Sequence, residues 1–455
     1  MSQERLPISL LTKEKDKNSL FSGLWIQWNA LTIPERVVCA NIVLLPAWWV
    51  AGLYRYMPTF ILLGIAFYEQ SRYQGLRLKR PSFSVVAFLA FCTYQCVGFL
   101  FFSVAIDDVG LTGLLRLFQF WFPVALLLWY IQSNDIRIRP EVAAWACSVS
   151  VVQMIGFWLV GHFIFGERPY VSPRTLFSIV SGNAEGDYVA GKGLGNYLIP
   201  YRPQDRIISG LARWSFFFVI PELSGLVAGF IGLLALDIRN RLWSLLLLAG
   251  SLFLLLLSGT RSTWIMLPVV VGIRFFFKIG QTRGFYIPLA LIAMVSFVTL
   301  SLPPVTDSIS TFFEETTESV GEARADSTEV RSEIYKRTIE RIPDNLILGH
   351  WVTGETVLPG FDIARVGSHS FILGSLLYRL GLIGTLLFIV FWISLFVWFY
   401  QTREGRPSVG YCLLIFYTLL CVVMEFGEPV ALMIPLLSAA IRSPKVEVER
   451  RMRYV

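Results

Sequence analysis

Five polar residues stand next to long apolar stretches of this 455-residue chain and have side chains suited to group transfer. They are Arg206, Arg213, Glu222, Arg261 and His369. Arginine is suited to planar, bidentate recognition of phosphate groups. A histidine that is neutral near pH 7 can remove a proton from a hydroxyl. These residue types therefore indicate a site that binds a phosphate and activates a hydroxyl.

Each of these residues also has a purely structural interpretation. An arginine at a helix end can anchor the helix at a membrane surface. Glu222 can serve only to pair with a neighbouring arginine, and His369 can cap the helix that follows it. We expect the other two histidines, His162 and His350, to be structural. A joint site is favoured only if the fold brings the charged residues to the same side of a membrane.

The composition predicts that the chain is an integral membrane protein. Hydrophobic residues make up 55% of it, charged residues 16%, and the mean hydropathy is +0.60, whereas soluble proteins have about a quarter of their residues charged. Apolar runs such as 242–257 do not alternate as the strands of a membrane barrel would. An all-α, polytopic transmembrane bundle is therefore expected.

The apolar runs predict about twelve spans, with roughly 20 residues per crossing. The expected limits are 37–54, 57–71, 83–105, 112–133, 141–165, 214–236, 242–259, 262–277, 285–303, 371–400, 408–427 and 429–442. Residues 1–30 lack the compact apolar core of a cleavable signal peptide, so we expect the first span to act as the insertion signal.

Lysine and arginine in the short connections predict the orientation. They occur in alternate connections, at Arg72, Arg77, Lys79, Arg80, Arg137, Arg139, Arg239, Arg241, Lys278, Arg283, Arg403 and Arg406, and again in the tail at Arg450, Arg451 and Arg453. This pattern places both termini in the cytoplasm. The charges are scattered along a membrane surface, so the net charge of +7 does not indicate nucleic-acid binding.

The spans and connections divide the chain into five parts. We expect a cytoplasmic tail at 1–36, spans 1–9 within 37–301 with an extracytoplasmic loop at 166–213, a large extracytoplasmic loop at 302–370, spans 10–12 within 371–442, and a basic cytoplasmic tail at 443–455. Connections longer than about a dozen residues are usually functional or disordered, so the loop at 302–370 requires an explanation.

The large loop is expected to be partly helical. One amphipathic stretch begins at Ile309, and a second covers 330–341. Ile334, Tyr335, Thr338 and Ile339 are predicted to lie on one side of the second stretch. No metal site is expected in the chain, since Cys92 and Cys96 share a helix face but lack histidine or carboxylate partners.

Three motifs in the second half of the chain resemble a known family. They are Ser258 to Ser262 around Arg261, the segment from Arg331 to Gly349, and His369-Ser370 followed by the glycines of 381–384. In this order they resemble the O-antigen ligase and O-antigen polymerase family of integral-membrane glycosyltransferases. The resemblance covers about residues 206–400. Serine follows His369 where asparagine is common in the family, and Pro221-Glu222 reverses the order of many polymerases.

The resemblance implies that a glycan is transferred from an undecaprenyl diphosphate carrier to an acceptor hydroxyl at the outer face of the bacterial inner membrane. It implies a reaction without a nucleotide, cofactor or metal. Arg213 and Arg261 would hold the diphosphate, and His369 would take the proton of the acceptor. Arg206, Glu222 and Arg331 would contact the substrate.

The acceptor separates the two activities of the family. A polymerase adds the chain to another lipid-linked repeat unit, whereas a ligase adds it to lipid A-core or a comparable terminal acceptor. The position of Glu222 close to Ser209-Gly210 favours polymerase. A lipid-linked glycan flippase or exporter would share many spans, but it should carry charges through the depth of the bilayer.

Overall fold

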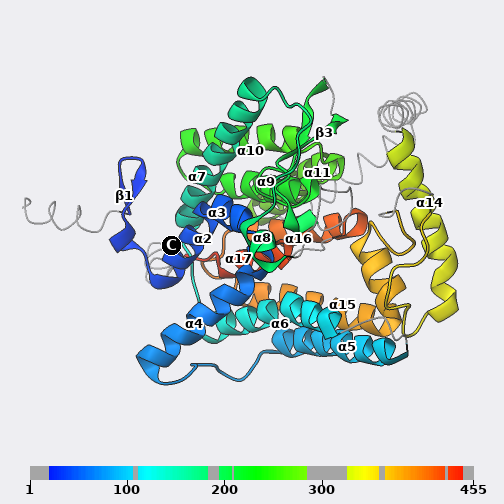
Figure 1. The fold of residues 1–455 in the computed structure, drawn as a ribbon. Helices are drawn as coiled ribbons and strands as arrows, with labels where there is room; N and C mark the ends of the chain where they lie inside the picture. Colours follow the sequence, from blue (N-terminus) through cyan, green and yellow to red (C-terminus); the bar gives the residue numbers. More distant parts are fainter. Residues whose placement is uncertain are drawn as a thin grey trace, which may run out of the picture.

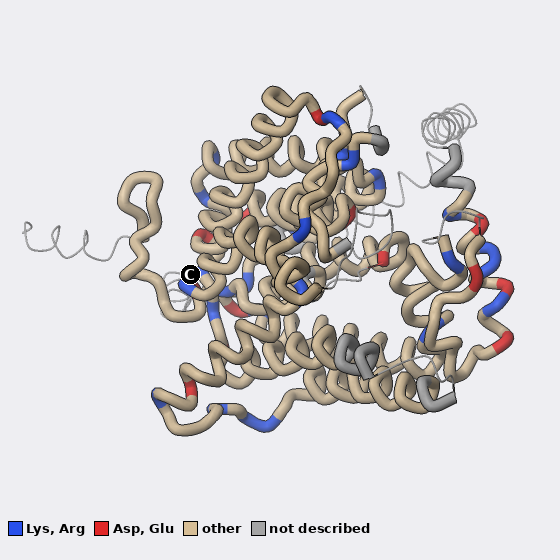
Figure 2. Tube along the Cα trace, in the orientation of Figure 1, with Lys and Arg blue, Asp and Glu red and all other residues tan. Residues whose placement is uncertain are grey.

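The computed structural model describes residues 20–105, 111–182, 194–206, 210–283, 325–357, 364–425 and 429–443. Long helices run side by side, with β1 at one end of the bundle and α14 at the other (Figure 1). α14 carries charges along its length, whereas in most of the other long helices the charged residues lie near the ends and the stretches between are almost uncharged (Figure 2). This arrangement is typical of a protein whose helices lie in lipid.

Most of the helices follow the apolar runs of the sequence, whereas α14 is rich in charged residues. Their bounds are α2 Ile33–Val43, α3 Leu45–Ala51, α4 Met57–Tyr73, α5 Phe83–Ala105, α6 Leu111–Ser133, α7 Pro140–Leu159, α8 Leu176–Ser181, α9 Pro221–Ala235, α10 Arg241–Ser258, α11 Arg261–Arg283, α14 Ala325–Arg341, α15 Arg379–Gln401, α16 Val409–Val423 and α17 Pro429–Ala440. Two π-helical turns, η3 Val160–Ile164 and η7 Phe371–Tyr378, continue α7 and precede α15.

Not all of the twelve predicted spans are confirmed. Within the described ranges, four helical stretches are long and apolar enough to cross a membrane, or five if the bent pair α2 and α3 forms one broken span. The four stretches are Phe83–Phe102, Pro140–Ile164, Arg241–Ser258 and Phe371–Gln401. The predicted span at 285–303 lies outside the described residues. The chain is therefore a multi-pass membrane protein by its apolar helices.

The all-α prediction is wrong in two places. Strands β1 Phe21–Ser22 and β2 Trp25–Ile26 form a short hairpin, and strands β3 Tyr201–Arg206 and β4 Ala212–Trp214 form a second. The predicted span 214–236 consequently begins too early, because α9 starts only at Pro221. Proline suits the first turn of a helix, and Ile220 before it is extended, which explains the start of α9.

Aromatic packing joins the two halves of the chain in the core. Phe88 of α5 stacks on Phe391 of α15 with ring centroids 4.1 Å apart, and Phe91 packs edge-on against Trp121 of α6. Such pairs are stable where rings are offset or perpendicular. Helices on the two sides of the large loop are therefore held directly against each other.

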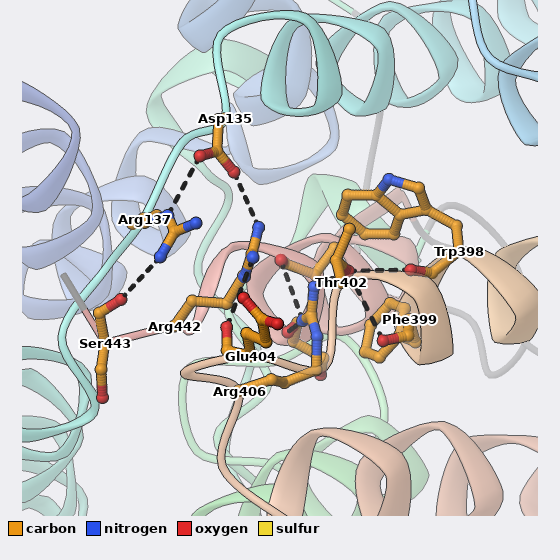
Figure 3. A network of polar contacts seen from close by, with 11 residues as sticks. Asp135, Arg137, Trp398, Phe399, Thr402, Glu404, Arg406, Arg442 and Ser443 are labelled. Atoms are coloured by element: carbon orange, nitrogen blue, oxygen red, sulfur yellow. Dashed lines mark hydrogen bonds and ion pairs between the residues drawn. The ribbon is translucent and has the colours of Figure 1, made fainter. Parts of the chain in front are cut away.

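A network of arginines joins the connections before α7, after α15 and after α17 (Figure 3). Asp135 accepts from Arg137 and from Arg442, and Arg406 donates to the carbonyls of Ser438 and Ala439 at the end of α17. Burial, together with the charge of Arg442, lowers the pKa of Arg406 to about 9. The three connections thus meet at one place, and the cytoplasmic location of that place stays a prediction.

Candidate active site

The β3–β4 hairpin carries the first arginine of the site. Arg213 lies on β4, directly opposite Arg202 on β3. The strand is held from behind by Glu167, whose carboxylate accepts from the backbone N–H of Ala212 at 2.7 Å and from the indole N–H of Trp214 at 3.0 Å. These bonds hold the backbone before Arg213 and the side chain after it, so the position of Arg213 depends on a carboxylate 46 residues earlier in the chain.

The predicted structural role of two histidines agrees with their contacts. His162 lies 3.1 Å from the Glu167 carboxylate through Nδ1 and stacks on Trp158, with ring centroids 5.2 Å apart. His350 stacks on Tyr378 at 4.2 Å between centroids. His162 thus contacts the carboxylate that holds β4, and His350 lies against Tyr378, next to the start of α15.

A single carboxylate joins arginines from two elements. Arg213 is almost fully buried; its Nε donates to the Ser258 carbonyl at 2.7 Å and its Nη2 to Oε1 of Glu222 at 2.9 Å. Arg331 of α14 approaches the same oxygen at 3.8 Å. Glu222 stands in the first turn of α9, where a negative charge is favoured by the helix dipole. It therefore holds the hairpin, α9 and α14 at one point.

The turn before Arg261 packs tightly against the start of α9. Gly259 ends α10 with φ of 60°, a left-handed conformation that suits glycine, and the Thr260 hydroxyl donates to the Pro221 carbonyl at 3.1 Å. A Cβ on Gly225 would lie 2.7 Å from Thr260, so even alanine would crowd this contact. Arg261 follows this turn at the start of α11, and the charges of Arg213 and Arg331 act on it.

The loop that carries His369 is held from two sides. From α14, the Tyr335 hydroxyl donates to the His369 carbonyl at 3.2 Å and the Thr338 hydroxyl accepts from the Gly367 N–H at 2.9 Å. From the other side, the Ser370 hydroxyl bonds the Val422 carbonyl at 2.6 Å and caps η7. His369 itself has φ of 65°, a conformation that is uncommon outside glycine and that often marks functional sites.

Burial and neighbouring charges favour the neutral form of His369. Its pKa is lowered from the ordinary 6.5 first by burial and then by the positive charge of Arg331. The negative charges of Glu425 and Glu222 oppose this shift without reversing it. A neutral imidazole at pH 7 can accept a proton, so the ring has the protonation state that a general base requires.

Two of the sequence motifs form a single structural feature. The segment around Gly349 lies directly on the start of α15: the Trp351 N–H donates to the Arg379 carbonyl at 2.8 Å, and the Leu382 N–H donates to the Leu346 carbonyl at 2.9 Å. A Cβ on Gly349 would lie 2.4 Å from the Arg379 carbonyl oxygen, and one on Gly381 would lie 2.4 Å from the Ile347 carbonyl oxygen. The large loop therefore docks on the bundle through two glycines.

Most of the predicted site residues come together. Arg213, Glu222 and Arg331 are in contact, and Arg261 and His369 are electrostatically coupled to that group. Arg206 ends β3, where its backbone pairs with Ala212, and its side chain is outside the described residues.

Several residues near the site were missed in the sequence. They are Arg202, whose charge acts on Glu222; Glu167, which positions β4; Ser368, beside the histidine; and the pair of Arg379 with Glu425. Nothing in the sequence indicated that Glu425 pairs with Arg379. The only signal in the sequence that could have drawn attention to Arg202 is its place among the charged residues near Pro203.

A known protein family matches the part of the chain that contains three of the predicted site residues. Residues 245–389 match the family model described as O-antigen ligase, which confirms the resemblance expected from the motifs. The match includes Arg261, Arg331 and His369, whereas Arg213 and Glu222 precede it. No curated protein matches the chain.

Proposed function

We propose that this chain, which carries an O-antigen ligase domain in a multi-pass membrane bundle, transfers a glycan from an undecaprenyl diphosphate carrier to an acceptor hydroxyl. The reaction takes place at the outer face of the bacterial inner membrane, with both termini of the chain in the cytoplasm. As a polymerase, the protein uses another lipid-linked repeat unit as the acceptor.

The observation that carries the proposal is the excess of positive charge around Glu222. Arg213 pairs with this carboxylate, Arg331 lies 3.8 Å from it, and Arg202 also acts on it. One carboxylate balances only one of these arginines. A diphosphate would balance the positive charge that remains in this cluster, to which Arg261 also belongs, and guanidinium groups bind phosphate oxygens through paired hydrogen bonds.

The arrangement supports a direct displacement at the sugar. The acceptor oxygen forms a bond with the anomeric carbon, while the bond from that carbon to the diphosphate oxygen breaks and its electron pair leaves with the diphosphate. Arg213 and Arg261 stabilise the negative charge that develops on the leaving group. The acceptor proton passes to the neutral imidazole of His369. This assignment requires neither nucleotide nor metal.

A ligase activity is the second candidate, and the description of the matched family favours it. The chemistry at the sugar is the same in both cases. Only the acceptor differs, because a ligase uses lipid A-core or a comparable terminal acceptor. The large loop lies over the histidine through α14, so acceptor choice is expected to depend on that loop.

The test is transfer in proteoliposomes that contain the purified chain, a lipid-linked glycan and one acceptor at a time. His369→Ala and Arg261→Ala should each reduce transfer at least about 100-fold, as expected for a lost base or a lost charge at the leaving group. The control is Arg337→Ala, an arginine of α14 that is exposed and paired with Glu333. Full activity in either site variant would remove that residue from the mechanism.

The same assay separates the other candidates. A polymerase lengthens the lipid-linked glycan, whereas a ligase moves it to the terminal acceptor. A flippase or exporter would move the glycan across the bilayer without forming a new glycosidic bond. Translocation without transfer by the wild-type protein would therefore overturn the proposal.

A further inference from the structure

Ser368 makes two short contacts that together determine which ring nitrogen of His369 carries the hydrogen. Its hydroxyl oxygen lies 2.6 Å from the carbonyl oxygen of Arg365 and 2.6 Å from Nδ1 of His369. The first contact joins two oxygen atoms. A carbonyl oxygen can only accept a hydrogen bond, so a hydroxyl at this distance must donate to it.

The Ser368 hydroxyl therefore donates its single hydrogen to the carbonyl oxygen of Arg365. The hydroxyl can still accept, and Nδ1 of His369 must then be the donor. In the alternative arrangement, Ser368 would donate to Nδ1 and leave two oxygens 2.6 Å apart with no hydrogen between them. That arrangement is repulsive. The neutral imidazole consequently carries its hydrogen on Nδ1 and its lone pair on Nε2.

The position of Ser368 is itself fixed by its surroundings. Ser368 is 8% exposed, and its N–H also donates to the Arg365 carbonyl, which closes a tight turn. On one side the Gly367 N–H is bonded to Thr338, and on the other the His369 carbonyl is bonded to Tyr335. The hydroxyl therefore has little freedom to turn toward a different partner.

We propose that Ser368 is a positioning residue that sets the tautomer of His369, so that Nε2 is the atom that takes the acceptor proton. This inference rests on the proposed function, because it assigns an atom to the base of that reaction. In the step itself, the acceptor O–H bond breaks, Nε2 gains the proton, and Ser368 accepts from Nδ1–H before and after the transfer. Ser368 touches neither the sugar nor the diphosphate.

The direct test is the tautomer of His369 in the full chain, labelled with ¹⁵N-histidine in lipid nanodiscs. The chain has only three histidines, and the resonances that disappear in His369→Gln identify the relevant ring. We expect Nδ1 of His369 to be protonated and Nε2 to be unprotonated in the wild type above the pKa of the ring. A wild-type ring with its hydrogen on Nε2 would overturn the inference without any variant.

Removal of the hydroxyl provides the kinetic test. Ser368→Ala should lower kcat about 10-fold or more, by analogy with the cost of removing the partner that orients a metal-ligating histidine, with little change in KM for the lipid-linked donor. It should also populate the Nε2–H tautomer, and Ser368→Thr, which keeps a hydroxyl, should restore both readouts. An unchanged kcat and tautomer in Ser368→Ala would contradict the assignment.

Two further variants are compared with Ser368→Ala: a control at another serine, and His369→Ala. Ser394 of α15 also donates to a carbonyl three residues earlier, at 2.7 Å, so Ser394→Ala removes the same kind of bond away from the site and should leave kcat unchanged. If His369→Ala is inactive while Ser368→Ala is fully active, the positioning role fails and the proposed function stands. If His369→Ala is active, the proposed base fails, whatever the tautomer.

Discussion

Arg213 and Glu222 form a nearly buried ion pair of 2.9 Å that joins the β3–β4 hairpin to the first turn of α9. The arginine side chain is 7% exposed and the carboxylate 22%, so neither partner is well solvated. Removing one partner of such a pair leaves an uncompensated charge. This pair is therefore important for the stability of the site as well as for its charge.

Glu222→Ala should destabilise the protein by about 3 kcal/mol, within the range for breaking a buried ion pair. Glu222→Gln should cost less, because the amide oxygen still accepts from Arg213. Thermal unfolding of the detergent-solubilised variants measures both. The control is Glu333→Ala, whose exposed pair with Arg337 should contribute less than about 1 kcal/mol. Equal midpoints for Glu222→Ala and the control would show that the pair is not structural.

The pH dependence of transfer should report the histidine. The ring acts in its neutral form, and its folded pKa lies below 6.5 because of burial and Arg331, against the opposing charges of Glu425 and Glu222. Activity should therefore be retained at pH 7 and lost as pH falls through a value below 6.5. The measurement is kcat/KM against pH, because this parameter reports the pKa of the protein without substrate.

Arg331→Gln tests the cause of that shift. Removing the positive charge of Arg331 should raise the pKa of His369 and move the acid limb of the profile to higher pH. Because Arg331 is also a candidate substrate contact, the position of the limb is compared rather than the height of the profile. A wild-type limb above 6.5, or one that Arg331→Gln moves to lower pH, would contradict the electrostatic argument.

Gly349→Ala should release the large loop from the start of α15. The residue has φ of 76°, and an added Cβ would lie 2.4 Å from the Arg379 carbonyl oxygen, so both backbone strain and a clash oppose the docked arrangement. Limited proteolysis should cut residues 342–357 faster than in the wild type, and transfer should fall. The control is Gly64→Ala in α4, where nothing lies within 4 Å of the added Cβ. An equal cleavage rate in the two variants would refute the docking role.

The apolar helices could be predicted from the sequence, but the hairpin could not. The run that became α5 was predicted as 83–105, the limits that the structure has, because its hydrophobicity is continuous. Phe216 to Phe218 extend the same kind of run before α9, yet they are buried in a loop rather than in a helix. Hydropathy alone does not separate a buried loop from the start of a span, and Pro203 conceals β3 because proline is rare within strands.

For α14, in the predicted large loop, the hydrophobic periodicity predicted part of the buried face correctly and part of it wrongly. Ile334 and Thr338 share a buried side, as their predicted common face requires, whereas Ile339 is 57% exposed and was wrongly placed on that face. Five residues correspond to about 140° around a helix, so Ile339 points away from Ile334. The predicted stretch from Ile309 lies outside the described residues.

The candidate site could be predicted only as a set of residue types. Arg213, Arg261 and His369 stood out because charge beside apolar runs is unusual. Their supporting partners did not stand out, since Glu167 and Ser368 act through contacts that only the folded chain creates. Sequence therefore indicated which groups carry the chemistry, and the fold adds which groups hold them in place.

The backbone on both sides of His369 has a consequence for how substrates reach it. The loop is bonded to α14 through Gly367 and the His369 carbonyl, and to the end of α16 through Ser370. An imidazole fixed in this way does not travel to meet an incoming sugar. The acceptor chain has to be delivered to a stationary ring, so the width and polarity of its approach route, rather than any motion of the histidine, select which glycan is used.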